Sequence, residues 1–238
     1  LIIYGPSGSG KSSLMSKAIE LAQKHTTKKV SYRFVGATEN SATSMDILTS
    51  LLLEHDIDVR PINDSNEATP NLKNLIDKDN SEICEKFSLK IYSHIENIKE
   101  QIVIFIDAVD QLFNADMFLW LSKLLPANIK IIISALNDQK YPDATTYFTT
   151  LSNKLTKKNF IETSSFSQPK ELLLNLLKKE NRTLQTEQIQ YVLQQYEGTK
   201  VPFYINIAVQ ELRHWKSHTP LNSINDKESK NTYQLANT

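Results

Sequence analysis

The first 165 residues carry two alternating hydrophobic patterns. Short runs of almost uninterrupted apolar residues are typical of strands buried in a parallel sheet, and they predict strands at 1–4, 102–106 and 129–134. Further strands are expected at 30–35 and 160–163. Apolar residues that recur every three or four positions predict helices at 13–23, 44–53, 83–100 and 117–125. Strands that alternate with helices in this way predict an α/β fold with a parallel sheet.

The same spacing describes the individual helices. In the helix at 13–23 the helical period is carried by Leu14, Ala18, Leu21 and Ala22. Ser44 is expected to cap the helix at 44–53, since a serine hydroxyl can accept a hydrogen bond from an unpaired N–H of the first turn. The buried face of that helix is predicted to consist of Ile47, Leu48, Leu51 and Leu52.

After Gln168 the pattern changes to helices only, which are predicted at 170–179, 186–196 and 202–215. We therefore expect three segments, which are an α/β core at 1–166, a helical subdomain at 167–217 and a polar tail at 218–238. The tail is expected to be disordered or to begin a further domain. The chain starts at Leu1, at the beginning of a strand, so we expect it to be a fragment of a longer protein.

A glycine-rich loop links the first predicted strand to the first predicted helix. Residues 5–12 read GPSGSGKS and match G-x-x-x-x-G-K-[ST] at every fixed position. Glycines let such a loop wrap around phosphate oxygens, and the N-terminus of the following helix adds positive potential. A flexible Gly/Ser linker is the alternative, but the position between an apolar strand and an amphipathic helix favours a phosphate-binding loop.

Within this loop, Lys11 is expected to reach the β- and γ-phosphates and to take part in catalysis, and the Ser12 hydroxyl to bind Mg²⁺. The residues predicted to contact the nucleotide here are Gly5, Pro6, Ser7, Gly8, Ser9, Gly10, Lys11, Ser12 and Ser13.

Acidic residues follow the most apolar strand. Asp107 is expected to bind Mg²⁺ through water. Asp110 is the candidate for polarising the attacking water, although an aspartate after a strand is also a common turn residue. Ser134 ends the next apolar strand and would face the γ-phosphate if that strand lay between those of the loop and Asp107. A serine that merely terminates the strand is the alternative.

Composition narrows the function classes. Lys plus Arg and Asp plus Glu each number 27, so the net charge is zero and nothing in it favours general binding to nucleic acid or anionic membranes. The single Cys84 excludes a disulfide framework and fits a reducing, cytoplasmic compartment. No apolar run approaches the roughly 20 residues that span a bilayer. The histidines lack ligand spacing, so no structural metal is expected.

Arginines are scarce, which bears on catalysis. An arginine that stabilises charge on the transferred phosphoryl group would have to be one of four residues or come from another chain. None of the four has a motif context for that role, so slow hydrolysis is expected. The four arginines are Arg33, Arg60, Arg182 and Arg213.

Together these segments resemble a NACHT-type NTPase of the STAND class, in the branch of nephrocystin-3-like and telomerase-associated-protein-like domains. The resemblance is carried by GPSGSGKSSL at 5–14, YRFVGAT at 32–38, IVIFIDAVDQL at 102–112, FLWLSKLLPANIKIIISAL at 118–136 and the helical stretch 181–215. It implies a sheet in the order 5-1-4-3-2, and a nucleotide packed between the α/β core and the helices. It also implies a switch, driven by ATP and Mg²⁺, that controls self-assembly of a larger signalling or scaffold protein.

By position, the resemblance makes Asp107 the metal aspartate, Asp110 the second acidic residue and Ser134 the first sensor. Pro202 would be the proline of the helical subdomain that approaches the nucleotide. Two positions depart from the pattern. Gln111 stands where a glutamate often follows the second aspartate, and Lys200 stands where a glycine often precedes the helical proline by two residues.

Two other functions stay open. One is an AAA-type or origin-recognition-like ATPase that acts on nucleic acid or protein, which would need a dedicated arginine finger and a basic face. The other is a scaffold that binds nucleotide permanently without hydrolysing it, with Gln111 as the mark of lost turnover. The absence of a guanine-reading N-K-x-D motif is consistent with ATP, which is favoured mainly by the resemblance.

Overall fold

The computed structural model describes residues 1–25, 27–38, 41–58, 81–98, 100–113, 118, 120–122, 125–155, 159–163 and 166–216. Contacts between residues divide the chain into two compact units. The first comprises Leu1–Gly5 and Lys11–Glu162, and the second comprises Pro6–Gly10 and Thr163–Thr238. The segment boundaries expected from the sequence, at 166 and 217, stay predictions.

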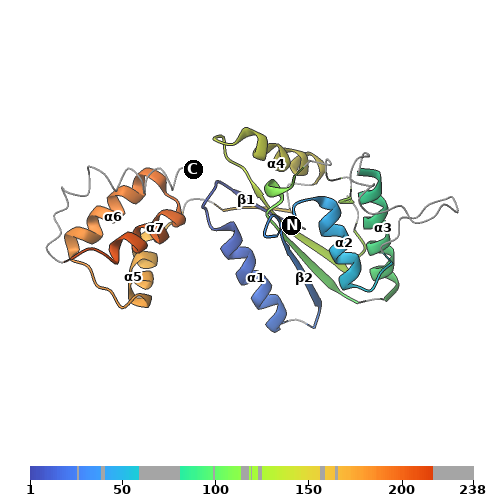
Figure 1. Ribbon diagram of the computed structural model, residues 1–238, viewed down its shortest axis with the longest axis horizontal. Coiled ribbons are helices and arrows are strands. Elements are labelled where there is room, and N and C mark those ends of the chain that lie inside the picture. The colour runs from blue at the N-terminus through green and yellow to red at the C-terminus, as the bar shows by residue number, and fades with distance from the viewer. Residues whose placement is uncertain are drawn as a thin grey trace. The chain divides into compact units, whose positions relative to one another are not determined.

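The first unit is built on a five-stranded parallel sheet (Figure 1). Its strands are β1 (Ile2–Gly5), β2 (Lys29–Phe34), β3 (Ile102–Asp107), β4 (Ile129–Leu136) and β5 (Phe160–Glu162). They lie in the order β2-β3-β4-β1-β5, which confirms the predicted order 5-1-4-3-2 read from the other edge. The carboxyl ends of β1, β3 and β4 therefore meet at one edge of the sheet, the usual ligand edge of open α/β folds.

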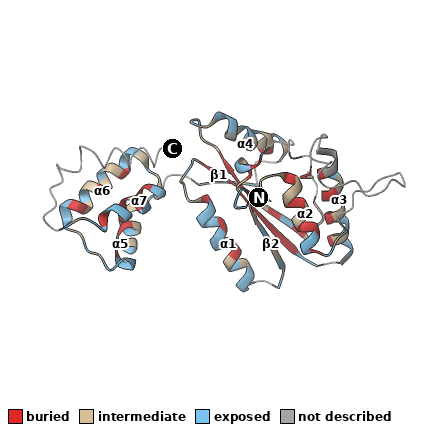
Figure 2. Cartoon of the chain, in the orientation of Figure 1, coloured by how far each residue is buried: buried red, intermediate tan, exposed pale blue. Residues whose placement is uncertain are grey.

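Helices cover both faces of the sheet. The helices of this unit are α1 (Lys11–His25), α2 (Ser44–Glu54), α3 (Ser81–Ile98) and α4 (Pro142–Lys154), with a short 3₁₀ turn, η3 (Val109–Gln111). Because neighbouring side chains of a strand point to opposite faces, β1 contributes Ile3 to the packing against α1, and Ile2 to the core on the other face. In Figure 2 the buried residues concentrate along the strands and on the inward sides of the helices.

The helix α1 buries a different stripe from the one its leucines suggested. Met15 and Ile19 are buried and pack with Ile3, while Leu14 and Leu21 are each 45% exposed. Met15 and Ile19 are four residues apart, as are Leu14 and Ala18, so spacing alone did not distinguish the two stripes.

The helix α2 begins as predicted, but its cap is Thr43 and not Ser44. The Thr43 hydroxyl accepts a hydrogen bond from the Asp46 N–H at 3.1 Å, and the Asp46 carboxylate accepts one from the Thr43 N–H at 3.0 Å. This reciprocal arrangement is a capping box, and it satisfies two donors that an open helix end would leave unpaired. Ser44 is instead buried, where its Oγ accepts a hydrogen bond from the Trp120 indole at 3.2 Å. The predicted buried face of Ile47, Leu48, Leu51 and Leu52 is confirmed.

Two further expectations differ from the structure. The helix α4 was not predicted, because the threonines at 145, 146, 149 and 150 weaken its helical pattern. A helix was expected at 117–125, but the residues described there, including Phe118 at φ 53°, are not helical. The remaining residues of that stretch, most of the polar stretch at 56–81 and the tail at 218–238 lie outside the described residues.

The described part of the second unit contains three helices, α5 (Pro169–Lys179), α6 (Thr186–Thr199) and α7 (Pro202–Leu212), close to the predicted ranges. They share a core that includes Leu173, Val192, Tyr196 and Ile205. Among the described residues of either unit, none of the helices combines the length and apolar content that crossing a bilayer requires.

Candidate functional site

The glycine-rich loop of residues 5–12 joins β1 to α1, where the sequence placed it. Gly8 and Gly10 adopt φ angles of 71° and 93°, which are accessible to glycine at little cost and strained for other residues. At Gly10 a Cβ would meet no atom within 4 Å, so the backbone angle alone calls for glycine. The Ser9 N–H donates a hydrogen bond to the Pro6 carbonyl at 3.3 Å and tightens the turn between them.

Lys11 is the first residue of α1 and is 8% exposed. Its ammonium donates a hydrogen bond to the Gly5 carbonyl at 2.9 Å, across the loop. Burial lowers the pKa of Lys11, and the negative charges of Asp110, Asp107 and Asp138 act against that lowering. A buried ammonium is therefore held on the Gly5 carbonyl, within electrostatic range of three carboxylates.

Asp107 is the last residue of β3 and is 5% exposed. The fully buried Ser134 hydroxyl hydrogen-bonds to its Oδ1. The strand β4 lies between β1 and β3, as the expectation for Ser134 required. It continues to Leu136, so Ser134 lies within the strand and the interpretation as a strand-terminating serine is wrong. Its described partner is the carboxylate of Asp107.

Asp110 lies in η3, three residues beyond Asp107. Its Oδ1 accepts a hydrogen bond from the Leu136 N–H at 2.8 Å, at the end of β4. Its Oδ2 accepts one from the Gln111 side-chain amide at 3.2 Å. A glutamate at position 111 would be an acceptor when ionised, so it would not make this bond.

The loop serines and Pro202 are placed as follows. Ser12 and Ser13 are exposed in the first turn of α1, and Ser7 is exposed in the loop. Pro202 is the first residue of α7. The next residue, Phe203, donates its N–H to the Gly8 carbonyl at 3.3 Å, within the second unit.

Gly8 also packs closely within that unit. A Cβ at Gly8 would lie 2.7 Å from Val201 Cγ1 and 3.0 Å from Phe203 Cβ, so any larger residue would require movement there. Ser9 Oγ lies 2.7 Å from Thr163 Oγ1, a second contact that involves the loop.

Asp138 is a site residue that the sequence analysis did not select. It follows β4 by two residues, and its charge acts on Lys11 together with those of Asp107 and Asp110. Its carboxylate accepts the Lys140 N–H at 3.0 Å, and its own N–H donates to Thr145 Oγ1 at 3.1 Å, at the entry to α4. Its position after a parallel strand, on the same edge as Asp107, was the available signal.

The arginines have other partners in the described part of the chain. Arg33 forms an ion pair with Glu54 at 2.7 Å, and Arg213 forms one with Glu180 at 2.6 Å. Arg182 donates to the Leu212 carbonyl at 3.1 Å, near the end of α7. Arg60 lies outside the described residues.

The donor set fits a divalent cation bound with a phosphate group. Among the described residues, only Ser134 donates a hydrogen bond to the Asp107 carboxylate. The second carboxylate oxygen of Asp107 could therefore bind a hard cation such as Mg²⁺, which prefers oxygen ligands. One ammonium faces three carboxylates here, so a polyanion would bind favourably only if it brought positive charge with it.

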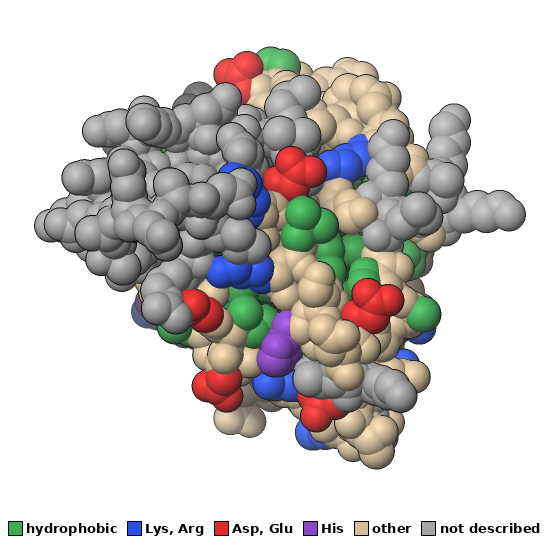
Figure 3. Space-filling view, turned by 90° about the vertical axis from the view of Figure 1, so that its right-hand side faces the viewer, with side chains coloured by type: hydrophobic (Ala, Val, Ile, Leu, Met, Phe, Trp, Pro, Cys, Tyr) green, Lys and Arg blue, Asp and Glu red, His purple; other side chains and the backbone are tan. Residues whose placement is uncertain are grey.

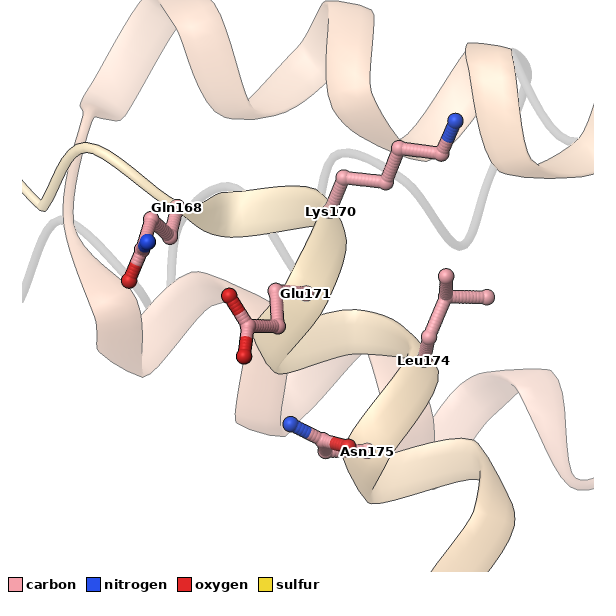
Figure 4. Close-up of a pocket in the computed structure, with 5 residues that line it drawn as sticks. All are labelled: Gln168, Lys170, Glu171, Leu174 and Asn175. Atoms are coloured by element: carbon pink, nitrogen blue, oxygen red, sulfur yellow. The ribbon is translucent and has the colours of Figure 1, made fainter.

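A separate hollow lies on the second unit. It has a volume of about 410 Å³ and is lined by Gln168, Lys170, Glu171, Leu174 and Asn175, all at or near the start of α5 (Figure 4). Its one ammonium and one carboxylate balance, so its lining offers no excess positive charge for a phosphate.

Comparison with known proteins gives the family. Residues 1–136, more than half of the chain, match the family described as "Nephrocystin 3, N-terminal". Nephrocystin-3 of Xenopus laevis is 29% identical over 157 residues, which cover 63% of this chain and 11% of that protein. The chain therefore spans about a ninth of the curated relative that it matches.

Solved structures share the fold at low identity. AMPPCP-bound DnaA from Aquifex aeolicus matches with a TM-score of 0.50 and 17% identity, over 99% of this chain and 60% of that one. The ORC2 protein of Aeropyrum pernix, solved as ADPNP-ADP complexes, matches with a TM-score of 0.51 and 12% identity, over 98% of this chain and 63% of that one. The fold is that of P-loop NTPases, and the chain belongs to the nephrocystin-3 N-terminal family.

Proposed function

We propose that this chain binds ATP together with Mg²⁺ and hydrolyses it slowly, as the nucleotide-dependent switch of a longer protein. The observation that carries the proposal is the buried Lys11 ammonium on the Gly5 carbonyl, in the electrostatic field of the buried Asp107. Burying an ammonium costs free energy unless it is compensated. A phosphate at this loop would supply that compensation, and so would explain why the chain keeps a lysine there.

The residues have distinct tasks in this proposal. The Lys11 ammonium, held on the Gly5 carbonyl, would donate its other N–H groups to phosphate oxygens, and the loop would supply its backbone N–H groups. Ser12 and Asp107 would hold Mg²⁺, which, when bound, neutralises charge on the phosphates. Ser134 would fix the orientation of Asp107 through its hydrogen bond to Oδ1. Pro202, at the start of α7, would be the residue of the helical segment that approaches the nucleotide.

Slow turnover is supported by the arginines. Arg33 and Arg213 are engaged in ion pairs and Arg182 binds backbone carbonyls, so each has a structural task already. An arginine that contacts the transferred phosphoryl group accelerates hydrolysis by about 10³–10⁵-fold, and a site without such an arginine lacks this acceleration. Any such arginine would then have to come from another chain or from Arg60.

The switch itself is proposed for the longer protein. The family membership and the small share of nephrocystin-3 that this chain covers support a module within a larger assembly. Binding of nucleotide would change the relative stability of two conformations, provided that its affinity for the two differs. Self-association and binding of other proteins would then be functions of regions outside this chain.

Single-turnover hydrolysis tests the enzymatic part. With protein in excess over γ-labelled ATP and with Mg²⁺ present, we expect slow release of labelled phosphate that is lost in Lys11→Ala. Lys17→Ala is a matched control, since Lys17 lies on the exposed side of α1 and pairs with Glu20. Binding of ATP without any release of phosphate would contradict the slow-ATPase proposal and favour the non-hydrolysing scaffold. Rapid turnover that is abolished by substituting a single one of the four arginines would favour the AAA-type alternative.

A further inference from the structure

Residues at the carboxyl end of β4 bind directly to three residues of the proposed nucleotide site and connect through one of them to a fourth, Lys11. Within four residues, this strand end donates three hydrogen bonds to three neighbouring segments of the first unit. Ser134 Oγ donates to Asp107, the Leu136 N–H to Asp110 and the Asn137 N–H to the Gly5 carbonyl, the last at 3.1 Å. The strand end thus joins the end of β3, the η3 turn and the last residue of β1.

The Gly5 carbonyl is the point at which this network reaches Lys11. It accepts the Asn137 N–H at 3.1 Å and the Lys11 ammonium at 2.9 Å. Leu136 and Asn137 are neighbours in sequence, so a shift of Leu136 would move the Asn137 N–H and with it the carbonyl that holds Lys11. Asp110 is therefore connected to Lys11 through two backbone N–H groups and the Gly5 carbonyl.

Asp110 is oriented toward this network. Its Oδ1 is 2.8 Å from the Leu136 nitrogen, a short distance that is typical of a charge-assisted hydrogen bond. Its Oδ2 accepts from Gln111 at 3.2 Å. A carboxylate committed to a backbone N–H is well suited to fix a loop, and less suited to turn toward a water on the phosphate.

We infer that Asp110 is a positioning residue that ties η3 to the end of β4, and not the base that activates water. Through Leu136 and Asn137 it holds the Gly5 carbonyl, and so the Lys11 ammonium, in place for the phosphate. Gln111 completes the arrangement, because its amide donates to the second Asp110 oxygen. This inference rests on the proposed nucleotide site and assigns to Asp110 a task in binding.

The pair Asp110→Asn and Asp110→Ala distinguishes the two roles. The Asn side chain keeps an oxygen that accepts the Leu136 N–H but does not act as a base, whereas Ala removes both functions. Mg-ADP is the probe, because its binding involves no hydrolysis. We expect Asp110→Asn to bind Mg-ADP within about 2-fold of wild type, and Asp110→Ala to bind it about 5–10-fold more weakly. Asp143→Asn and Asp143→Ala, at an exposed position in the first turn of α4, are the matched controls.

Hydrogen exchange without nucleotide gives a second readout. Peptides that contain Leu136 and Asn137 are expected to exchange faster in Asp110→Ala than in wild type or Asp110→Asn. If wild type binds no nucleotide, the proposed function fails, but hydrogen exchange still tests whether Asp110 fixes the end of β4 through the Leu136 N–H. Unchanged exchange in Asp110→Ala would overturn the inference. Equal Mg-ADP affinity in all three proteins, with hydrolysis lost in both variants, would also overturn it and restore Asp110 as the base.

Discussion

At the scale of single residues, the candidate site depends on buried polar groups that have specific partners. Lys11, Asp107 and Ser134 are all buried, and each makes a hydrogen bond or faces an opposite charge. Burying such groups is costly unless they are paired, so their arrangement leaves little freedom to the side chains. These fixed positions favour a pre-formed site, in which a phosphate would add to the contact that Lys11 already makes with the Gly5 carbonyl.

A buried histidine in the same unit makes stability depend on pH. His55 is 4% exposed, and its Nε2 lies 3.3 Å from Ser31 Oγ. Burial lowers the pKa of His55 below 6.5, and the positive charge of Lys29 adds to that lowering, while Glu54 opposes it. Below pH 6.5 the unfolded chain therefore binds more protons at His55 than the folded chain does. The free energy of unfolding thus reaches its full value, as far as His55 is concerned, above pH 6.5 and falls as the solution becomes more acidic.

We therefore expect urea midpoints of unfolding to fall between about pH 7 and pH 5, and this fall to be smaller in His55→Gln. His214→Gln, at an exposed position after α7, should keep the wild-type pH dependence. An identical decline in wild type and His55→Gln would show that other groups cause it.

At the scale of helices and strands, much of the fold could be predicted from the sequence. The strands β1, β3 and β4 follow from apolar runs, and the helices α5, α6 and α7 from apolar spacing. The strand order came from the family resemblance. The misses have local causes. Thr43 and Ser44 are adjacent residues of similar capping ability, and threonines obscured α4.

The candidate site divides in the same way. The loop motif predicted the position of Lys11, and the end of the most apolar strand predicted that of Asp107. Partners depend on tertiary packing, so the bond of Asp110 to the Leu136 N–H carries no signature in a single sequence. For Asp138, whose charge acts on Lys11, the position shortly after an apolar strand was the one signal.

Lys200 provides a test at the scale of a helix end. It follows α6 with φ 54° and ψ 23°, and its N–H donates to the Tyr196 carbonyl at 2.7 Å. In this left-handed conformation a side chain costs about 1–2 kcal/mol, part of which glycine loses again through its greater freedom when unfolded.

We expect Lys200→Gly to stabilise the protein by about 0.5–1 kcal/mol, which corresponds to a rise in Tm of about 1–3 °C. Glu197→Gly, at an exposed position inside α6, should lower Tm instead, because glycine is unfavourable within a helix. A lower Tm for Lys200→Gly would contradict this explanation of the helix end.

At the scale of the whole molecule, the fold and the family agree with a nucleotide-binding module. On the one face drawn in Figure 3, the described acidic and basic side chains are interspersed with hydrophobic ones, an arrangement that does not favour nucleic acid there. The net charge of zero has the same implication. The likeness to DnaA and ORC2 supports the fold alone.

Thermal unfolding in the presence of nucleotides tests the central claim most directly. Wild type and Lys11→Ala would be titrated with ATP, ADP and GTP, each with Mg²⁺ and with EDTA. A ligand at 100 times its Kd adds about 2.7 kcal/mol, so we predict a rise in Tm of about 5–10 °C for ATP or ADP with Mg²⁺. The rise should be reduced by EDTA and absent in Lys11→Ala. No rise with any nucleotide, or an equal rise in Lys11→Ala, would contradict nucleotide binding at this loop.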